Sequence, residues 1–137
     1  MSKNDKLIPT ESQEAIVLVQ WLRLKGLLHQ HSPNETGSSP EARRRAIRMK
    51  QQGTSPGYPD YTIFIPPSKS ADGNAYCLLI ELKRLKNSST STFQKRWIDG
   101  INDMESPYIV AYIAKGADEA IKIVNHHLCK SKETSPF

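Results

Sequence analysis

Two short runs decide the fold: Gly57–Ile65, with the sequence GYPDYTIFI, and Cys77–Leu85, with the sequence CLLIELKRL. Each run places charged residues beside residues that favour burial in a strand. Asp60 stands at the start of the first apolar segment, and Glu81 and Lys83 end the second. A polar segment with an Asp-Gly turn separates them, so we expect two antiparallel strands joined by a short connection.

The expected pairing brings the charged side chains together. In an antiparallel pair the start of one strand faces the end of the next, so Asp60 and Glu81 meet at one edge of the sheet. Glu81 and Lys83 are two residues apart and therefore point to the same face, whereas Leu82 points the other way, into the core. One side of this strand pair is thus expected to carry two carboxylates and an ammonium group.

These three groups suit phosphodiester chemistry. Two adjacent carboxylates repel each other unless a cation neutralises them, and Mg²⁺ prefers carboxylate oxygen and keeps several waters. Such an ion polarises a phosphoryl oxygen and lowers the pKa of a bound water, and a lysine beside it stabilises charge on the phosphate. Taken singly, the Glu–Lys pair reads as an ordinary surface ion pair and Asp60 as an acid in a proline turn. The combination of motifs favours the catalytic interpretation.

Composition narrows the class of protein. The chain has 137 residues and a formal net charge of +5, which fits one globular domain with a polyanionic partner such as nucleic acid. Its two cysteines form no CxxC pair, so a thiolate zinc site is not expected. The first residues lack the apolar core of a signal peptide, and no apolar run is long enough to span a membrane, so we expect a cytoplasmic protein.

The remaining patterns predict a small α/β domain. Helical spacing, caps and turn residues indicate the order helix, strand, helix, strand, strand, helix, strand, helix, with a mixed sheet flanked by helices. We expect flexible tails at 1–9 and 130–137 around a single domain at 10–129. The predicted elements are helices at 11–25, 40–53, 93–104 and 117–128, and strands at 27–31, 61–65, 75–82 and 108–114.

The motifs resemble those of a known family. "GYPDYTIFI" followed by "LLIELKRL" is similar to the core of the PD-(D/E)XK nuclease superfamily, which has a restriction-endonuclease-like fold. The early helix, "HSPNE", the glutamine and tryptophan of "FQKRWI" and the final strand and helix resemble the VRR-NUC domain within it. The likeness runs from about Glu11 to Leu128 and implies a stand-alone VRR-NUC protein of phage or bacterial type, without a separate DNA-reading domain.

The resemblance implies roles for individual residues. Asp60 and Glu81 are expected to bind Mg²⁺ or Mn²⁺ together with the backbone carbonyl of Leu82, and Lys83 to position the attacking water. An acid of the first helix completes the site; Glu11 is preferred because it lies ahead of the apolar run, with Glu14 as the open alternative. The resemblance also places Gln94 near the site. His31 and Asn34 match a further motif, and we expect His31 to brace the structure or touch phosphate rather than to catalyse.

Basic residues predict where DNA lies. Most crowd the second helix, where the alternative is an ordinary solvated face, and others follow the Glu81 strand and Gln94. Contacts of this kind give salt-dependent affinity with little sequence information. No helix suited to base reading and no exposed aromatic ladder for single strands is evident. The predicted DNA-binding residues are Arg43, Arg44, Arg45, Arg48, Lys50, Arg84, Lys86 and Lys95.

The expected activity is hydrolysis of DNA phosphodiesters by one or two metal ions. Stand-alone members resemble Holliday-junction resolvases, so we expect branched DNA as substrate and a homodimer that supplies two symmetric cuts, through the first or last helix. The alternatives are a sequence-specific restriction endonuclease on the same core and a basic nucleic-acid-binding module without catalysis.

Overall fold

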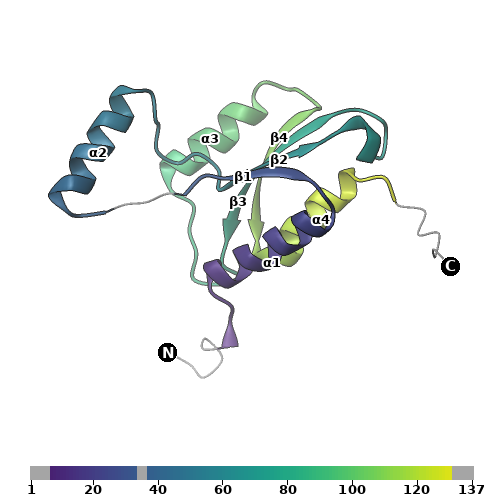
Figure 1. Ribbon diagram of the computed structural model, residues 1–137, viewed down its shortest axis with the longest axis horizontal. Coiled ribbons are helices and arrows are strands. Elements are labelled where there is room, and N and C mark those ends of the chain that lie inside the picture. Colours follow the sequence, from purple (N-terminus) through teal and green to yellow (C-terminus); the bar gives the residue numbers. More distant parts are fainter. Residues whose placement is uncertain (1–6, 34–36, 131–137) are drawn as a thin grey trace.

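The computed structural model describes residues 7–33 and 37–130. Over these residues the predicted order of helices and strands is confirmed (Figure 1). The short 3-10 helix η2 lies inside the segment expected to be a plain turn. In chain order the elements are α1 (Glu11–Leu24), β1 (Leu28–His31), α2 (Pro40–Gln51), β2 (Tyr61–Ile65), η2 (Pro67–Lys69), β3 (Tyr76–Lys83), α3 (Thr92–Asn102), β4 (Ile109–Lys115) and α4 (Gly116–His127).

Some predictions fall outside the described residues. These are most of the two predicted tails, at 1–6 and 131–137, and Asn34 with Glu35 of the "HSPNE" motif. Within the described ranges no helix combines the length and the apolar character needed to cross a bilayer.

The sheet is mixed, as predicted, with the strand order β1-β2-β3-β4. β2 pairs antiparallel with both β1 and β3, whereas β3 and β4 run parallel and are joined through α3. In the β2–β3 pair Tyr61 lies opposite Ile80. Because the strands are antiparallel, the next residues at that end, Asp60 and Glu81, face each other.

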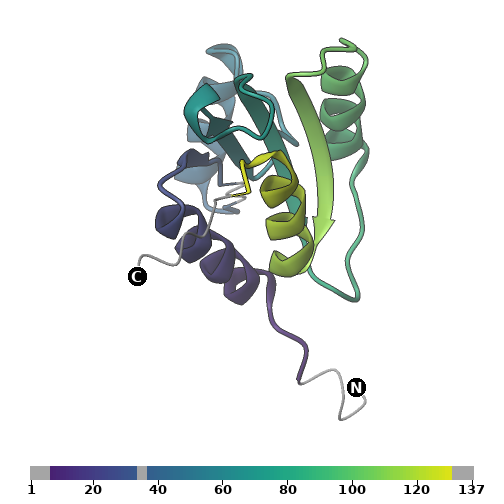
Figure 2. The ribbon, with the colours of Figure 1, turned by 90° about the vertical axis from the view of Figure 1, so that its right-hand side faces the viewer.

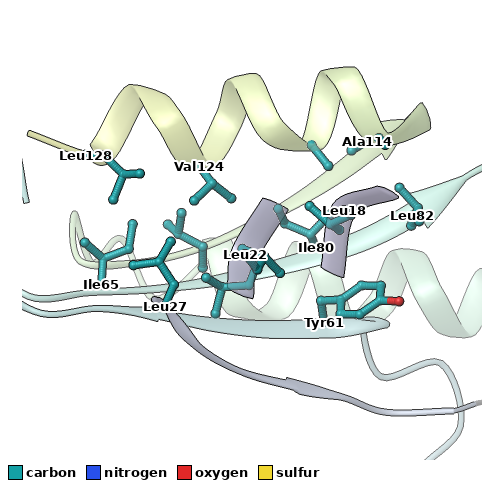
Figure 3. Close-up of a cluster of buried hydrophobic side chains, with 14 residues drawn as sticks. Leu18, Leu22, Leu27, Tyr61, Ile65, Ile80, Leu82, Ala114, Val124 and Leu128 are labelled. Carbon is teal, nitrogen blue, oxygen red and sulfur yellow. The ribbon is translucent and has the colours of Figure 1, made fainter. Parts of the chain in front are cut away.

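The larger core lies between the sheet and the helices α1 and α4 (Figure 3). Leu78, Ile80 and Leu82 alternate along β3 and point into this core, where they meet Leu18 and Leu22 of α1 and buried residues of α4 such as Val124. The predicted inward orientation of Leu82 is confirmed, since its side chain is buried there. Strand periodicity therefore leaves the intervening residues of β3 for the opposite face.

α3 covers that opposite face (Figure 2). Leu79 of β3 packs in a smaller buried cluster with Ile98 and Ile101 of α3 and Ala111 of β4. The side chain of Asn102 donates a hydrogen bond to the Ala111 carbonyl and accepts one from its N–H, at 3.0 and 2.9 Å. These contacts fasten the middle and the C-terminal end of α3 to the sheet.

α2 stands apart from the rest of the molecule (Figure 1). It begins after the N-cap Ser39, whose hydroxyl accepts a hydrogen bond from the Ala42 N–H, and has a proline in its first turn. None of its residues is buried. Helix propensity and capping, rather than core packing, therefore account for this element.

Candidate active site

Asp60 and Glu81 are tied together through the backbone at the ends of β2 and β3. The Asp60 N–H donates to Oε2 of Glu81 at 3.2 Å, and the Leu82 N–H donates to Oδ2 of Asp60 at 2.9 Å. Both carboxylates are largely removed from solvent, with exposed fractions of 8% for Asp60 and 2% for Glu81. Each acid is thus held in place by a backbone donor beside the other acid, and the expected meeting of the two residues is observed.

Lys83 and Gln94 complete a hydrogen-bonded group around Glu81. The Lys83 ammonium donates to Oε1 of Gln94 at 2.7 Å and lies 3.5 Å from Oε1 of Glu81. Nε2 of Gln94 donates to that same glutamate oxygen at 2.6 Å. Gln94 also forms the capping box of α3 with Ser91, so the start of the helix and the orientation of Lys83 depend on one amide.

Gly57 allows the loop before Asp60 to approach α3 closely. Its φ of +87° is favourable only for glycine, and a Cβ atom there would lie 2.5 Å from the carbonyl carbon of Phe93 and 2.7 Å from the N–H nitrogen of Gln94. The "PGYPD" loop and the first turn of α3 are therefore in close contact, and a larger residue at position 57 would push them apart. This contact sets Asp60 and Gln94 on either side of Glu81.

Burial raises the pKa of both acids. The pKa of Glu81 rises to about 7, mainly because the side chain is desolvated and secondly because the Asp60 carboxylate is close; the Lys83 ammonium partly offsets this rise. Desolvation also raises the pKa of Asp60, against the N–H of Leu82, which favours its charged form, and with a further upward contribution from Glu11. The site therefore holds more negative charge than its own lysine compensates.

Glu11 and Asp60 border a hollow beside the acidic site. The first turn of α1 and the ends of β1 and β2 enclose a hollow of about 260 Å³, whose lining includes Glu11, His31, Asp60 and Leu82. His31 ends β1 and stacks on Tyr61 with ring centroids 4.8 Å apart. His31 therefore braces this end of the sheet and borders the hollow, and its place there depends on the pairing of His31 with Tyr61 across β1 and β2.

Glu14 contacts the start of α4 rather than the acidic site. Its Oε2 accepts a hydrogen bond from the N–H of Ala117, in the first turn of α4. That helix has no side-chain cap of its own, and a Cβ atom on Gly116 would lie 2.6 Å from the same carboxylate oxygen. Glu14 therefore caps α4, whereas Glu11 faces the hollow beside Asp60.

The donor set fits a hard divalent cation. Two carboxylates lie side by side, and Oδ1 of Asp60 has no hydrogen-bond partner among the described residues. No three His, Cys, Asp or Glu side chains of the described ranges converge closely enough to form a ready-made ligand cage. Mg²⁺ is usually held by one or two carboxylates with water completing its shell, so this incomplete cage suits it.

Comparison with known proteins gives the family. A family model for the VRR-NUC domain matches residues 6–115. The chain belongs to the VRR-NUC domain family. It is also similar to a solved structure of a VRR-NUC domain protein, with 26% sequence identity over 87% of this chain and 88% of the other and a TM-score of 0.64. No curated protein matches the sequence.

Membership of the VRR-NUC family implies a nuclease-type function for this chain. The resemblance drawn from the PD and ExK motifs is confirmed, and so is the mixed α/β fold expected from it. The matched residues include Asp60, Glu81, Lys83 and Gln94, which meet at one end of the sheet.

The basic residues of this VRR-NUC chain occupy different surroundings. Those of α2, at 43, 44, 45, 48 and 50, are all exposed, as are Lys86 and Lys95. Arg84 is half-buried and donates hydrogen bonds to the carbonyls of Pro9 and Ile8. Arg84 therefore anchors the segment before α1 as well as lying beyond the Glu81 strand.

The different positions of Glu11 and Glu14 predict different effects of their substitution on stability. Glu14→Ala removes the cap of α4 and should lower the free energy of unfolding by about 1 kcal/mol, the usual cost of losing an N-cap. Glu11→Ala removes an exposed acid that repels Asp60 but favours the start of α1, so the two effects offset each other and stability should stay nearly unchanged. Thermal unfolding of both variants by circular dichroism makes the comparison. Equal losses in the two variants would contradict the assignment of Glu14 to the helix cap.

Proposed function

We propose that this chain is a metal-dependent DNA endonuclease that cuts branched DNA, such as a four-way junction, as a homodimer. The observation that carries the proposal is the meeting of Asp60 and Glu81 with Lys83 at one end of the sheet. Two buried carboxylates with raised pKa values need a cation partner, and an ammonium group beside them suits a reaction that builds negative charge on phosphate.

Asp60 and Glu81 would hold the ion, with the backbone carbonyl of Leu82 as a further ligand. A divalent cation, Mg²⁺ or Mn²⁺, supplies neutralisation of the carboxylates and polarisation of a phosphoryl oxygen when it is bound. Glu11 is exposed and borders the same hollow as Asp60, so its side chain is free to rotate toward the ion or to bind its water shell.

Lys83 would position the attacking water and offset charge on the phosphate. Its ammonium group is held by Gln94 and has an exposed side-chain fraction of only 9%. Because a buried cation near a reacting phosphate is weakly screened by solvent, its charge acts more strongly than that of a surface lysine. Gln94 is a positioning residue in this proposal, since it contacts Lys83 and Glu81 through the same amide group.

α2 would guide DNA to this site. Five cations lie on a helix with no buried residue, next to the segment that leads into Asp60. A projecting basic helix can contact phosphates without disturbing a core, and phosphate contacts orient DNA without reading its sequence. This favours recognition of DNA shape over sequence-specific restriction.

The homodimer is placed at α1 in this proposal. α1 exposes Ile16, Val17 and Leu24 along one largely apolar face that also carries Gln13 and Gln20, with Arg23 at its edge, and Ile16 is 55% and Leu24 81% exposed. The exposed residues of α4 are polar or charged, including Asp118, Glu119 and Lys122. Two copies with a net charge of +5 each repel less where they meet through a face that carries few charges.

Cleavage assays test the catalytic proposal. Wild-type protein with Mg²⁺ or Mn²⁺ should cut a labelled four-way junction faster than plain duplex and should be inactive in EDTA. Asp60→Ala, Glu81→Ala and Lys83→Ala should each lower the rate by at least about a hundredfold, because each removes a group at the reacting phosphate. The matched control is Asp99→Ala, which removes an exposed acid of α3 away from this group.

The same assay separates the alternatives. Binding of all DNAs without cutting of any would favour the non-catalytic module. Cutting at a single duplex sequence would favour a restriction-type enzyme. Full activity of Glu81→Ala would remove the proposed site altogether.

Changes in α2 test the DNA path. Arg44→Ala combined with Arg48→Ala should weaken DNA binding and reduce the slope of log Kd against log salt concentration by about one for each phosphate that the variant no longer neutralises. Lys122→Ala combined with Lys130→Ala removes two exposed charges elsewhere and should leave the slope nearly unchanged. Fluorescence anisotropy at several salt concentrations measures both. Identical slopes in the two double variants would mean that α2 is an ordinary solvated helix.

Substitutions in α1 test the dimer. Ile16→Glu combined with Leu24→Glu should convert a dimer to a monomer in sedimentation experiments at micromolar concentration, because two buried charges would face an apolar partner. Asn125→Glu combined with His126→Glu adds the same charge to the exposed face of α4 and should leave the dimer intact. A wild-type protein that sediments as a monomer in the presence of junction DNA would contradict the homodimer.

A further inference from the structure

A second hollow lies beside the acidic site, on the outer side of α3. It has a volume of about 730 Å³ and is lined by the end of α2, the segment after it and one side of α3. Phe93 belongs to its wall and immediately precedes Gln94, whose side chain contacts Glu81 and Lys83. A molecule in this groove would therefore lie next to the reacting groups without touching them.

The wall of the groove is aromatic and apolar. Phe93, Trp97, Gly100 and Met104 follow one another at spacings of four, three and four residues, so they form one stripe along α3 and the turn after it. Helical spacing alone places Phe93 and Trp97 near Ile98 and Ile101 on one broad side of the helix. Only the latter two are buried; Phe93 is 55% and Met104 57% exposed, because their side of the helix turns away from the sheet.

Trp97 is held rigidly in this wall. Its indole N–H donates to the carbonyl of Pro56 at 3.0 Å, and the ring meets Tyr58 edge-on with centroids 5.0 Å apart. The polar atom of the indole is thus already satisfied within the protein, and the accessible part of the ring offers only a flat apolar surface. A planar, apolar ligand face gains most from such a surface.

Cations stand at the rim of the groove. Lys50, at the end of the basic helix α2, and Arg96 of α3 both line it. A flat aromatic wall framed by lysine and arginine matches the two parts of a nucleotide, its base and its phosphate. Paired bases in a duplex are stacked inside the helix and have no free face for this wall, whereas an unpaired base does.

We propose that this groove binds an unpaired nucleobase of the DNA, stacked on Phe93 and Trp97, with an adjacent phosphate on Lys50 and Arg96. The inference rests on the proposed function in that it takes DNA as the substrate of the neighbouring acidic site. It specifies the kind of branched DNA: one with unpaired nucleotides beside the cleavage point, as in a flap or an opened junction.

Binding measurements without metal test the groove independently of cleavage. Fluorescence anisotropy in EDTA compares a flap with an unpaired arm against a fully paired duplex of equal length. Phe93→Ala should weaken flap binding by about five- to a hundredfold and leave duplex binding within twofold, because the stacking of a base on an aromatic ring is removed. Phe93→Tyr keeps the ring and should restore flap affinity. Leu28→Ala, which trims an exposed apolar residue of β1, is the matched control.

A crosslink locates the base. DNA with 5-iodouracil at successive positions of the unpaired arm, irradiated in complex with the wild-type chain, should attach to Phe93 or Trp97 at one position near the branch and not in the duplex arm. Mass spectrometry of the digested complex identifies the residue. Crosslinks only to α2, or to no aromatic residue of α3, would overturn the proposal.

The other possible outcomes of these binding measurements also distinguish between explanations of the groove. Equal weakening of flap and duplex by Phe93→Ala would assign the groove to general backbone contact, and unchanged affinity for both would remove it as a binding site. A loss of dimer mass in Phe93→Ala would mean that a second copy of the chain covers the groove, and would overturn the proposal. Failure of wild-type cleavage together with selective flap binding would reject the nuclease function and leave the base site standing.

Discussion

The pairing of β2 with β3 is the constraint on which the rest of the molecule depends. Tyr61 opposite Ile80 leaves Asp60 opposite Glu81, and two backbone N–H groups then fix the two carboxylates beside each other. A shift of one residue in this register would turn Leu78, Ile80 and Leu82 out of the core and Glu81 into it. Burial of these apolar side chains therefore stabilises the register that places the two acids side by side, and so offsets the repulsion between them.

Hydrogen bonds and the Lys83 ammonium group offset only part of the desolvation free energy of the two buried acids. Backbone donors, Gln94 and Lys83 satisfy both carboxylate oxygens of Glu81 and one of Asp60, yet the pKa of Glu81 still rises to about 7. Buried charges that are hydrogen-bonded but not neutralised raise the free energy of the folded state, and such a state favours a cation. α3 contributes twice, because Gln94 closes the helix cap and orients Lys83 with one amide group.

Much of this site follows from sequence, because it is made by local periodicity. The alternation of β3 predicts the orientation of Glu81, Leu82 and Lys83, and the turn between the two central strands predicts their pairing with Asp60. The features of the site that the sequence does not predict depend on contacts between elements that are distant in the chain. Glu11 and Glu14 both suit a first helical turn; only the position of α4 gives Glu14 to the Ala117 N–H.

The outer face of α3 shows the same limit of sequence reasoning. Helical spacing groups Phe93 with Ile98 and Ile101 into one broad apolar arc, and the sequence alone cannot say which part of that arc meets the sheet. In the structure Ile98 and Ile101 meet the sheet and Asn102 bonds to Ala111, whereas Phe93 and Met104 lie on the exposed side. The five cations of α2 indicate a solvated face, but the sequence does not predict that the helix has no buried residue at all.

The free energy of unfolding, measured against pH with and without Mg²⁺, tests the central claim most directly. The pKa of Glu81 is higher in the folded protein than its ordinary value of 4.5, so the folded state binds its proton more tightly. Stability of the metal-free protein should therefore fall as pH rises from about 4.5 to about 7. Mg²⁺ should abolish that fall in the wild-type chain and not in Asp60→Asn. Stability at pH 8 that does not respond to Mg²⁺ or Mn²⁺ would contradict the account.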